Sequence, residues 1–285
     1  MPTTARQRPA SRKQIVNRLQ TFRNKQHRRL RRILLRYGKT RRIHILGAAR
    51  SGTTLMHCAM SAFEKTIVHP KESNVNHPSI NDVLRIGIHN RVRRTDKIYV
   101  TKRGYGWFQE PLLNEFCDDA LAGGYGVIYM VRDPADVLTS VHKGEAERRF
   151  YLEPQRWSRS VRAGERLTEQ LSGKVPFLIV RYEDLVRHPE ETRDRVESTF
   201  GLRLQPKVES WANLDSNVAP ESLGDLATAL HSIRSFDVAS IGKWKVNPEL
   251  ADYWKSLLDS DIATELARFG KTYGYDIDSL IVGQK

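Results

Sequence analysis

Two glycines, an arginine and several hydroxyl side chains lie close together in the segment 41–55, RRIHILGAARSGTTL. Gly47 and Gly52 flank a short turn that contains Arg50, and two threonines follow it. A turn between a strand and the start of a helix directs free backbone amides and the positive end of the helix dipole at an anion. The segment therefore predicts an anion-binding loop.

The spacing of the two glycines is that of the nucleotide-binding P-loop, but Thr53 stands where that loop has its lysine. A lysine at this position reaches the outer phosphates of a bound triphosphate. Here the cation is Arg50, inside the turn. The loop therefore favours an anion of phosphate-like shape over the triphosphate of an ordinary ATPase or kinase. Taken alone, the segment also fits a plain strand-to-helix turn with a surface arginine.

A second cation follows the strand predicted at 126–131, GVIYMV. Arg132 comes directly after this strand, Asp133 suits a helix N-cap, and Pro134 suits the first helical turn. Ser140 would then lie about two turns along the helix. Because a guanidinium can hold a phosphate through a bidentate fork, Arg132 and Ser140 predict a second phosphate clamp. An ion pair between Arg132 and a nearby acid is the alternative.

The elements that position these residues follow from the hydrophobic pattern. Short apolar runs predict strands at 43–46, 66–68, 97–102, 126–131 and 177–180. Helical spacing predicts helices from 53, over 111–122, over 157–171, from 189 to Gly201 and over 251–270. Alternation of strands and helices indicates an α/β fold with a central parallel sheet flanked by helices, which binds ligands where its strands end.

Four segments, in this order along the chain, resemble the sulfotransferases that use 3′-phosphoadenosine 5′-phosphosulfate (PAPS). They are GAARSGTTL, the R-D-P turn with its later serine, RYEDL at 181–185 as the end of a strand, and SIGKWK at 240–245, which by this resemblance is expected to fold over the nucleotide. The resemblance covers roughly 41–269 and implies a P-loop NTPase-like three-layer fold. The sequence of these segments most resembles that of protein-tyrosine and bacterial carbohydrate or small-molecule sulfotransferases. Lys102 is followed by Arg103 and Gly104 rather than the Asp-Pro of the tyrosine enzymes, which leaves the acceptor open.

The resemblance implies roles for particular residues. Those expected to bind PAPS, or its product adenosine 3′,5′-bisphosphate (PAP), are Arg50, Ser51, Gly52, Thr53, Thr54, Arg132, Ser140, Tyr182, Gly242, Lys243, Trp244 and Lys245. Arg50 and Lys102 are expected to stabilise the sulfuryl and leaving-group oxygens. Glu72 is expected to act as general base, with His69 and His77 as alternatives. No metal is expected, because PAPS has no triphosphate to neutralise.

The predicted reaction is in-line transfer of a sulfuryl group to a hydroxyl of a tyrosine, a carbohydrate or a small molecule, helped by a general base. Two other classes of protein remain open as alternatives. A P-loop kinase or NTPase would need a phosphate-reaching lysine and an acidic strand end, which the loop and Arg132 do not supply. A non-catalytic polyanion-binding protein would account for the basic residues discussed next, but not for Arg132 together with Ser140.

Positive charge is concentrated at the start of this 285-residue chain, whose net charge is +14. Sixteen of the 47 Lys and Arg residues precede Glu64, the first acidic residue. We expect residues 1–40 to form a basic amphipathic arm ahead of a sulfotransferase domain at 41–285. The arm could lie on an anionic membrane surface, bind a polyanion, or pack on the domain, and it also resembles a transit peptide. Specific nucleic-acid binding is not expected, and the sequence does not determine the oligomeric state.

The cysteine content and the lengths of the apolar runs suggest a location. Cys58 and Cys117 fall in apolar helical patterns, which predicts buried thiols in a reducing compartment. No apolar run approaches the length of a membrane span, and no signal-peptide pattern opens the chain. We therefore expect a soluble, cytoplasmic protein, with peripheral membrane contact through the arm as an open alternative.

Overall fold

The computed structural model describes residues 41–68, 97–102, 110–123, 125–141, 149–206, 208, 210–211 and 236–277. Within them, five parallel strands form one sheet in the order β2-β3-β1-β4-β5. The strands are β1 Arg42–Gly47, β2 Thr66–Val68, β3 Ile98–Lys102, β4 Gly126–Val131 and β5 Phe177–Arg181. All five predicted strands are confirmed, and β1, which leads into the glycine loop, is the middle strand.

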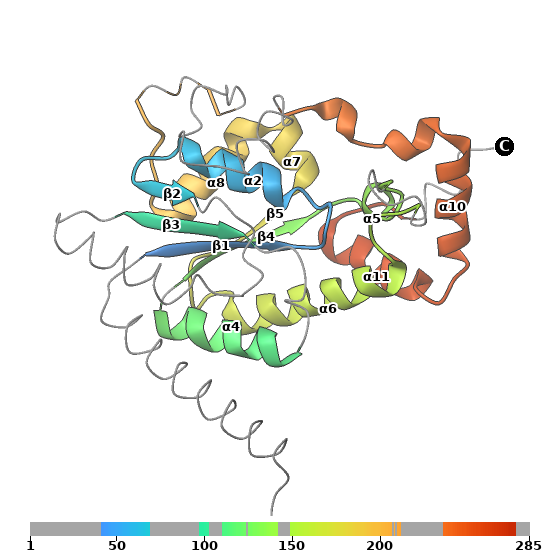
Figure 1. Ribbon diagram of the computed structural model, residues 1–285, viewed down its shortest axis with the longest axis horizontal. Coiled ribbons are helices and arrows are strands. Elements are labelled where there is room, and N and C mark those ends of the chain that lie inside the picture. The colour runs from blue at the N-terminus through green and yellow to red at the C-terminus, as the bar shows by residue number, and fades with distance from the viewer. Residues whose placement is uncertain are drawn as a thin grey trace, which may run out of the picture.

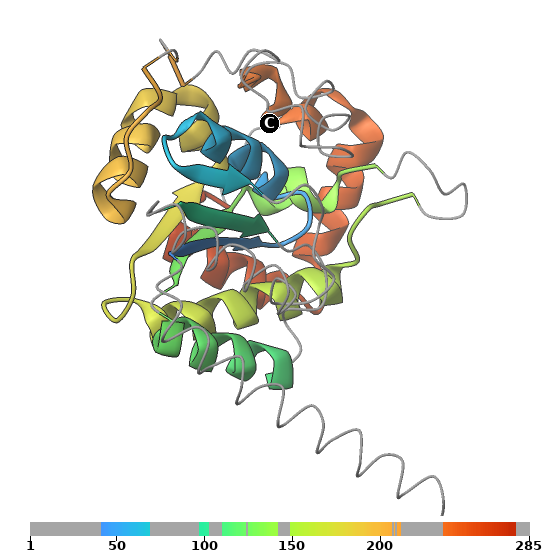
Figure 2. The same cartoon turned by 60° about the vertical axis from the view of Figure 1, so that its left-hand side comes forward.

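Helices cover both faces of the sheet (Figures 1 and 2). The helices are α2 Thr53–Ala59, α4 Glu110–Gly123, α5 Pro134–Leu138, α6 Pro154–Leu171, α7 Tyr182–Arg187, α8 Pro189–Phe200, α10 Pro248–Leu258 and α11 Ala263–Tyr273. Short 3₁₀ turns are η1 Met60–Ala62, η4 Val238–Ser240 and η5 Lys243–Val246. Figure 1 shows α2, α7 and α8 on one face and α4 and α6 on the other, with α5 and α10 beyond the carboxyl ends of the strands. This confirms the predicted three-layer α/β fold.

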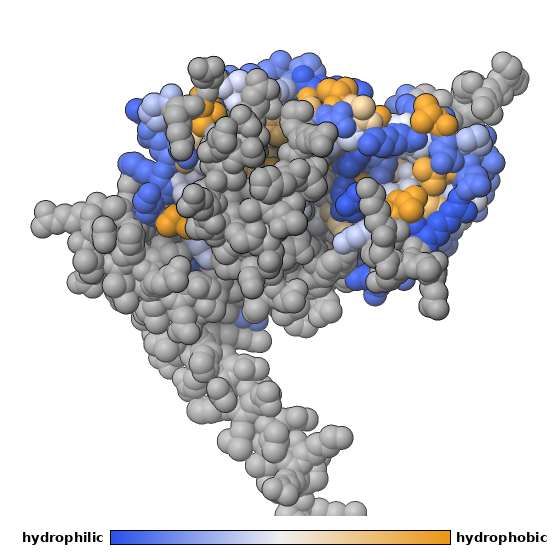
Figure 3. All heavy atoms as spheres, turned by 45° about the horizontal axis from the view of Figure 1, so that its top comes forward, coloured by the Kyte–Doolittle hydropathy of each residue, from blue (hydrophilic) through white to orange (hydrophobic). Residues whose placement is uncertain are grey.

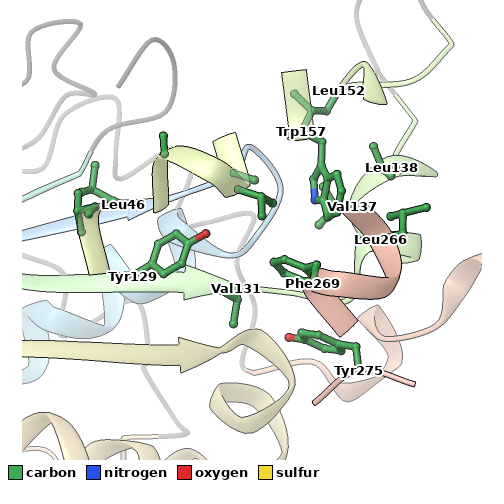
Figure 4. Packing of buried hydrophobic residues seen from close by; sticks show 14 of the residues in the cluster. Leu46, Tyr129, Val131, Val137, Leu138, Leu152, Trp157, Leu266, Phe269 and Tyr275 are labelled. Carbon is green, nitrogen blue, oxygen red and sulfur yellow. The ribbon is translucent and has the colours of Figure 1, made fainter. Parts of the chain in front are cut away.

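Every residue of β1, β3 and β4 is buried, as expected for strands covered on both faces. One hydrophobic core lies between the sheet and α4, α6 and α11, and a second lies beneath α2, α7 and α8. Figure 4 shows Trp157 and Phe269 of the first core beside Val137. The rings of Trp157 and Phe269 meet edge to face, with centroids 5.3 Å apart. Aromatic packing therefore joins α6 and α11 near the carboxyl end of β4.

Three predictions about local structure are wrong. The single helix expected at 251–270 is two helices, because the polar run at 259–261 ends α10 and the Ser260 hydroxyl bonds to Leu257 O at 2.6 Å. Ser140 does not lie on a helix: α5 ends at Leu138, and Val141 forms a bridge with Phe150. The RYEDL segment leaves the sheet after its arginine and becomes α7, whose first turn has acidic residues that suit a helix N-terminus.

Both cysteines are buried and free, as predicted. Burial raises the pKa of the Cys58 thiol to about 12 and that of Cys117 to about 11, so both stay protonated at neutral pH. In the part of the chain that the structure describes, no helix combines the length and apolar character needed to cross a membrane. On the face drawn in Figure 3, hydrophobic side chains of the described residues form only small separate patches. The predicted arm at 1–40 lies outside these residues.

Candidate active site

The turn between β1 and α2 is built around two positions that admit only glycine. A side-chain carbon at Gly47 would lie 2.4 Å from Ser51 Oγ and 2.7 Å from Met130 O. Gly52 has φ 92°, and a side-chain carbon there would lie 2.4 Å from the ring of Tyr182. Both contacts are far shorter than van der Waals packing allows, so the backbone of the turn lies directly against β4 and α7.

Backbone and side-chain hydrogen bonds close this turn. The amide and hydroxyl of Ser51 both donate to Ala48 O, at 3.1 and 2.7 Å. Ser51 is 1% exposed, so its hydroxyl supports the loop from within. Arg50 has φ 70°, a left-handed conformation that costs a non-glycine residue about 1–3 kcal/mol. No described side chain caps the N-terminus of α2, so its first amides remain available to an anion.

Lys102 brings a cation to this turn from the end of β3. Because β3 lies next to β1 in the sheet, Lys102 is paired in register with Ile45, two residues before the loop. Its ammonium group donates to Thr54 Oγ1 at 2.6 Å. Lys102 is 3% exposed. Lys102 therefore lies beside the start of α2.

Arg50 and Ser140 contact each other directly. Arg50 Nε donates to Ser140 Oγ at 2.9 Å, and the Arg50 guanidinium lies 5.3 Å from the centre of the Tyr151 ring. Tyr151 is fixed in turn by its amide, which donates to Ser140 O at 2.8 Å. Ser140, predicted to clamp a phosphate together with Arg132, therefore contacts Arg50 instead.

Arg132 leaves the end of β4 and lies behind the same turn. Its Nη1 donates to Arg50 O at 3.2 Å and its Nη2 to Ser240 O at 2.7 Å. The guanidinium stacks on the Tyr182 ring at 4.1 Å, and Nη2 lies 3.4 Å from Asp136 Oδ2. The predicted alternative of an ion pair with an acid is thus realised, but it leaves Arg132 Nε buried without a hydrogen-bond partner among the described residues.

Carboxylates hold the backbone around Arg132. Asp133 caps α5 as predicted, accepting from Ala135 N at 2.8 Å. Glu183 accepts from the backbone amide of Asp133 at 3.0 Å and from the Tyr275 hydroxyl at 2.7 Å. Burial, with further contributions from the nearby acids, raises the pKa of Asp133 to about 6.

The late segment expected to fold over a nucleotide reaches Arg132 in part. The Gly242 amide donates to both carboxylate oxygens of Asp136 at 3.0 Å, and Tyr182 and Ser240 share a hydroxyl–hydroxyl bond of 2.5 Å. Trp244 is 5% exposed and packs against Trp254 in the core, with ring centroids 6.0 Å apart. Lys243 and Lys245 are exposed on either side of it.

The structure brings together most of the residues predicted to bind the donor. Glu72, His69 and His77 lie outside the described residues, so the predicted base remains a sequence-based prediction. Sequence reasoning missed two carboxylates, Asp136 and Glu183, and two tyrosines, Tyr151 and Tyr275. Only Asp136 had a usable signal, because it lies four residues after Arg132 at the start of a helix, where i,i+4 pairs meet.

A glycine turn after the middle strand of a parallel sheet, with cations at three strand ends, defines a P-loop-like α/β protein. Residues 120–206 match the family model described as "Sulfotransferase family". The chain is 28% identical over 138 residues to "Carbohydrate sulfotransferase 3" of Rattus norvegicus. That match covers 42% of this chain and 28% of the relative, so it spans under a third of the relative's length.

Two solved structures share the fold. They are the sulfotransferase domain from the curacin biosynthetic pathway (TM-score 0.57, 16% identity, 82% of this chain and 97% of that one) and the sulfotransferase domain from the Synechococcus PCC 7002 olefin synthase (TM-score 0.59, 16% identity, 83% and 95%). At this identity the likeness concerns the fold alone. Together with the match of residues 120–206 to the family model, it supports the predicted sulfotransferase family.

Proposed function

We propose that this protein transfers a sulfuryl group from PAPS to the hydroxyl group of an acceptor. The observation that carries the proposal is the convergence of Arg50, Lys102 and Arg132 on one glycine turn. They come from the ends of three adjacent strands, so the sheet itself sets their spacing. Three cations around the N-terminus of α2, which no described side chain caps, suit a ligand with more than one anionic group.

The residues present fit such a donor. The turn has no room for a side chain at Gly47 or Gly52, so its amides can be approached closely by an anion. Arg132 Nε is buried and lacks a partner among the described residues, which favours a further acceptor at this position. Arg132 Nη1 donates to Arg50 O, so the two arginines lie close enough to contact the two phosphate groups of one nucleotide bisphosphate.

When bound, PAPS supplies a sulfuryl group attached to a good leaving group. In this proposal, the amides of residues 52–54 hold the 5′-phosphate, because the Ser51 amide already donates to Ala48 O, and Arg132 holds the 3′-phosphate. Arg50 and Lys102 stabilise the negative charge that develops on the oxygen between donor and sulfuryl group. Glu72 takes the proton from the acceptor hydroxyl, with His69 or His77 as the alternative base. Positioning and electrostatics then account for the acceleration, as in phosphoryl transfer.

A kinase or NTPase is the alternative from the same fold. Thr53, 8% exposed, occupies the position of the lysine that would reach a triphosphate. The strand next to β1, β4, is followed by Arg132 rather than by an acid suited to bind magnesium. A non-catalytic polyanion binder would need neither the strained Arg50 backbone nor the contact between Lys102 and Thr54. We therefore favour transfer from PAPS.

We propose only the chemical class of the acceptor, which is a molecule with a free hydroxyl group. The name of the curated relative makes carbohydrate hydroxyls the first candidates, followed by tyrosine and small molecules. The decisive experiment incubates the full chain with PAPS and an acceptor panel and detects sulfated product and PAP by mass spectrometry. Parallel reactions contain ATP and magnesium in place of PAPS. Sulfated product from PAPS supports the proposal, whereas phosphorylated product or ATP hydrolysis would replace it with the kinase or NTPase alternative.

We further propose that the basic arm at 1–40 docks the enzyme on an anionic surface. Its 13 Lys and Arg residues, with no acid among them, would be attracted to anionic lipid. Deleting residues 1–38 should abolish sedimentation with anionic vesicles while turnover of a soluble acceptor stays unchanged. Loss of folding together with activity would show instead that the arm is part of the core.

A further inference from the structure

We infer that Asp136 is a positioning residue that ties the segment 238–246 to Arg132 and thereby sets the affinity for the 3′-phosphate of the donor. This inference rests on the proposed function. It assigns to Asp136 a role that acts through Arg132 rather than by contact with the donor. Its basis is a set of contacts that meet at one buried carboxylate.

Asp136 faces two partners from different parts of the chain. Its side chain is 2% exposed, and Oδ2 lies 3.4 Å from Arg132 Nη2. Both of its oxygens accept from the backbone amide of Gly242, each at 3.0 Å. Gly242 has φ 72°, a left-handed conformation that turns this amide toward α5 at little steric cost. A carboxylate buried this deeply is stabilised only by such partners.

The same segment contacts Arg132 by a second route. Arg132 Nη2 donates to Ser240 O at 2.7 Å, while the Ser240 hydroxyl bonds to the Tyr182 hydroxyl at 2.5 Å. The Tyr182 ring in turn carries the Arg132 guanidinium at 4.1 Å. Arg132, Asp136, Ser240, Gly242 and Tyr182 therefore form a closed circuit around one guanidinium. Removing the carboxylate opens this circuit where β4, α5 and the late segment meet.

The orientation of the guanidinium, rather than its charge, explains why the tie matters for an anion. With Asn at position 136, the guanidinium would keep its charge and its bond to Ser240 O but lose its carboxylate partner, and one acceptor oxygen instead of two would remain for the Gly242 amide. Arg132 could then sample rotamers that do not present a fork to the 3′-phosphate. The expected result is weaker binding of a 3′-phosphorylated nucleotide, with little effect on a nucleotide that has only a 5′-phosphate.

The experiment compares Asp136→Asn with the wild-type full chain by calorimetric titration with PAP and with adenosine 5′-monophosphate. We expect PAP affinity to fall about tenfold, the scale of one charge-assisted hydrogen bond, and affinity for the monophosphate to change less than about twofold. In an Arg132→Ala background, Asp136→Asn should change PAP affinity by less than about twofold, because both act on one interaction. Hydrogen exchange of the Gly242 amide should accelerate in Asp136→Asn.

Two further variants keep the test decisive. Asp252→Asn makes the same chemical change on α10, where the carboxylate is exposed and, among the described residues, pairs with Lys255, and it should leave both affinities unchanged. Tyr182→Phe serves as the test if Asp136→Asn does not fold. It removes the bond to Ser240 but keeps the ring under Arg132, and it should weaken binding of PAP but not of the monophosphate. Equal losses for PAP and the monophosphate, or additive losses with Arg132→Ala, would overturn the inference. A wild-type chain that does not prefer PAP to the monophosphate would refute the donor assignment itself, and the inference with it.

Discussion

The two proposed phosphate sites are built in opposite ways. The turn at 47–54 addresses an anion mainly with backbone amides, and glycines packed against β4 and α7 set its shape. The turn after β4 relies on one side chain, Arg132, which a tyrosine ring, two carbonyl oxygens and a carboxylate hold in place. A site made of backbone amides tolerates substitution of its side chains but not a change in the backbone conformation. A site made of one side chain depends on the residues that hold that side chain in place. Arg50 links the two sites. It is part of the turn at 47–54, and its carbonyl oxygen accepts a hydrogen bond from Arg132.

The largest effect should come from a residue assigned to neither site. Glu72→Gln removes the predicted proton acceptor, so kcat should fall about 10²–10⁴-fold while PAP affinity stays nearly unchanged. Steady-state kinetics combined with PAP calorimetry separates the two quantities. Near-normal turnover in Glu72→Gln, together with loss of turnover in His69→Ala or His77→Ala, would assign the base to a histidine. Reduced PAP affinity would show that donor binding is not confined to the two turns.

Arg50→Gly tests how the first site divides its work between backbone and side chain. Glycine accepts the left-handed backbone at this position but removes the cation, so we expect kcat to fall about 10²–10³-fold without loss of stability. Arg50→Ala removes the same cation and keeps the strain. Thermal unfolding should therefore find the glycine variant more stable than the alanine variant by about 1 kcal/mol. Equal turnover in wild type and Arg50→Gly would mean that the amides alone suffice.

Arg132→Ala tests the side-chain site. Losing a charge-assisted fork should weaken PAP binding by about 2 kcal/mol and leave adenosine 5′-monophosphate almost unaffected. Calorimetry with both nucleotides measures the difference. Unchanged PAP affinity would remove Arg132 from the 3′-phosphate site and leave it as a structural residue of the network with Asp136.

The contrast between the sites also explains what the sequence could predict. The glycine spacing and the apolar runs depend on local rules, and they located β1, the turn, α2 and β4 correctly. The direct contact between Arg50 and Ser140 depends on where α5 ends, which the Thr139 hydroxyl helps determine by bonding to Ala135 O. The support of Asp133 by Glu183 and Tyr275 joins residues far apart in the chain. No local pattern encodes such contacts, so these supporting residues were missed.

The partly buried carboxyl group of Asp133, next to Arg132, makes the free energy of unfolding depend on pH. Because the pKa of Asp133 is raised in the folded protein, stability from this group is fully present below its ordinary pKa of 3.8 and is lost as pH rises through about 6. Asp133→Asn keeps a good N-cap but cannot ionise, so it should gain roughly 1–2 kcal/mol relative to wild type at pH 7. The advantage should disappear near pH 4. Denaturant unfolding of both proteins from pH 4 to 8 measures it, and a difference that does not vary with pH would contradict the raised pKa.

The central claim, that the two turns together bind a nucleotide with phosphate groups at both its 5′ and 3′ positions, is tested most directly by competitive calorimetry on the wild-type full chain. PAP, adenosine 5′-monophosphate, and ATP with magnesium are titrated under one set of conditions. Engagement of both sites predicts that PAP binds at least about tenfold more tightly than either of the others, because only PAP reaches Arg132 through a 3′-phosphate. Equal affinity for PAP and the monophosphate, or tighter binding of ATP with magnesium, would contradict it.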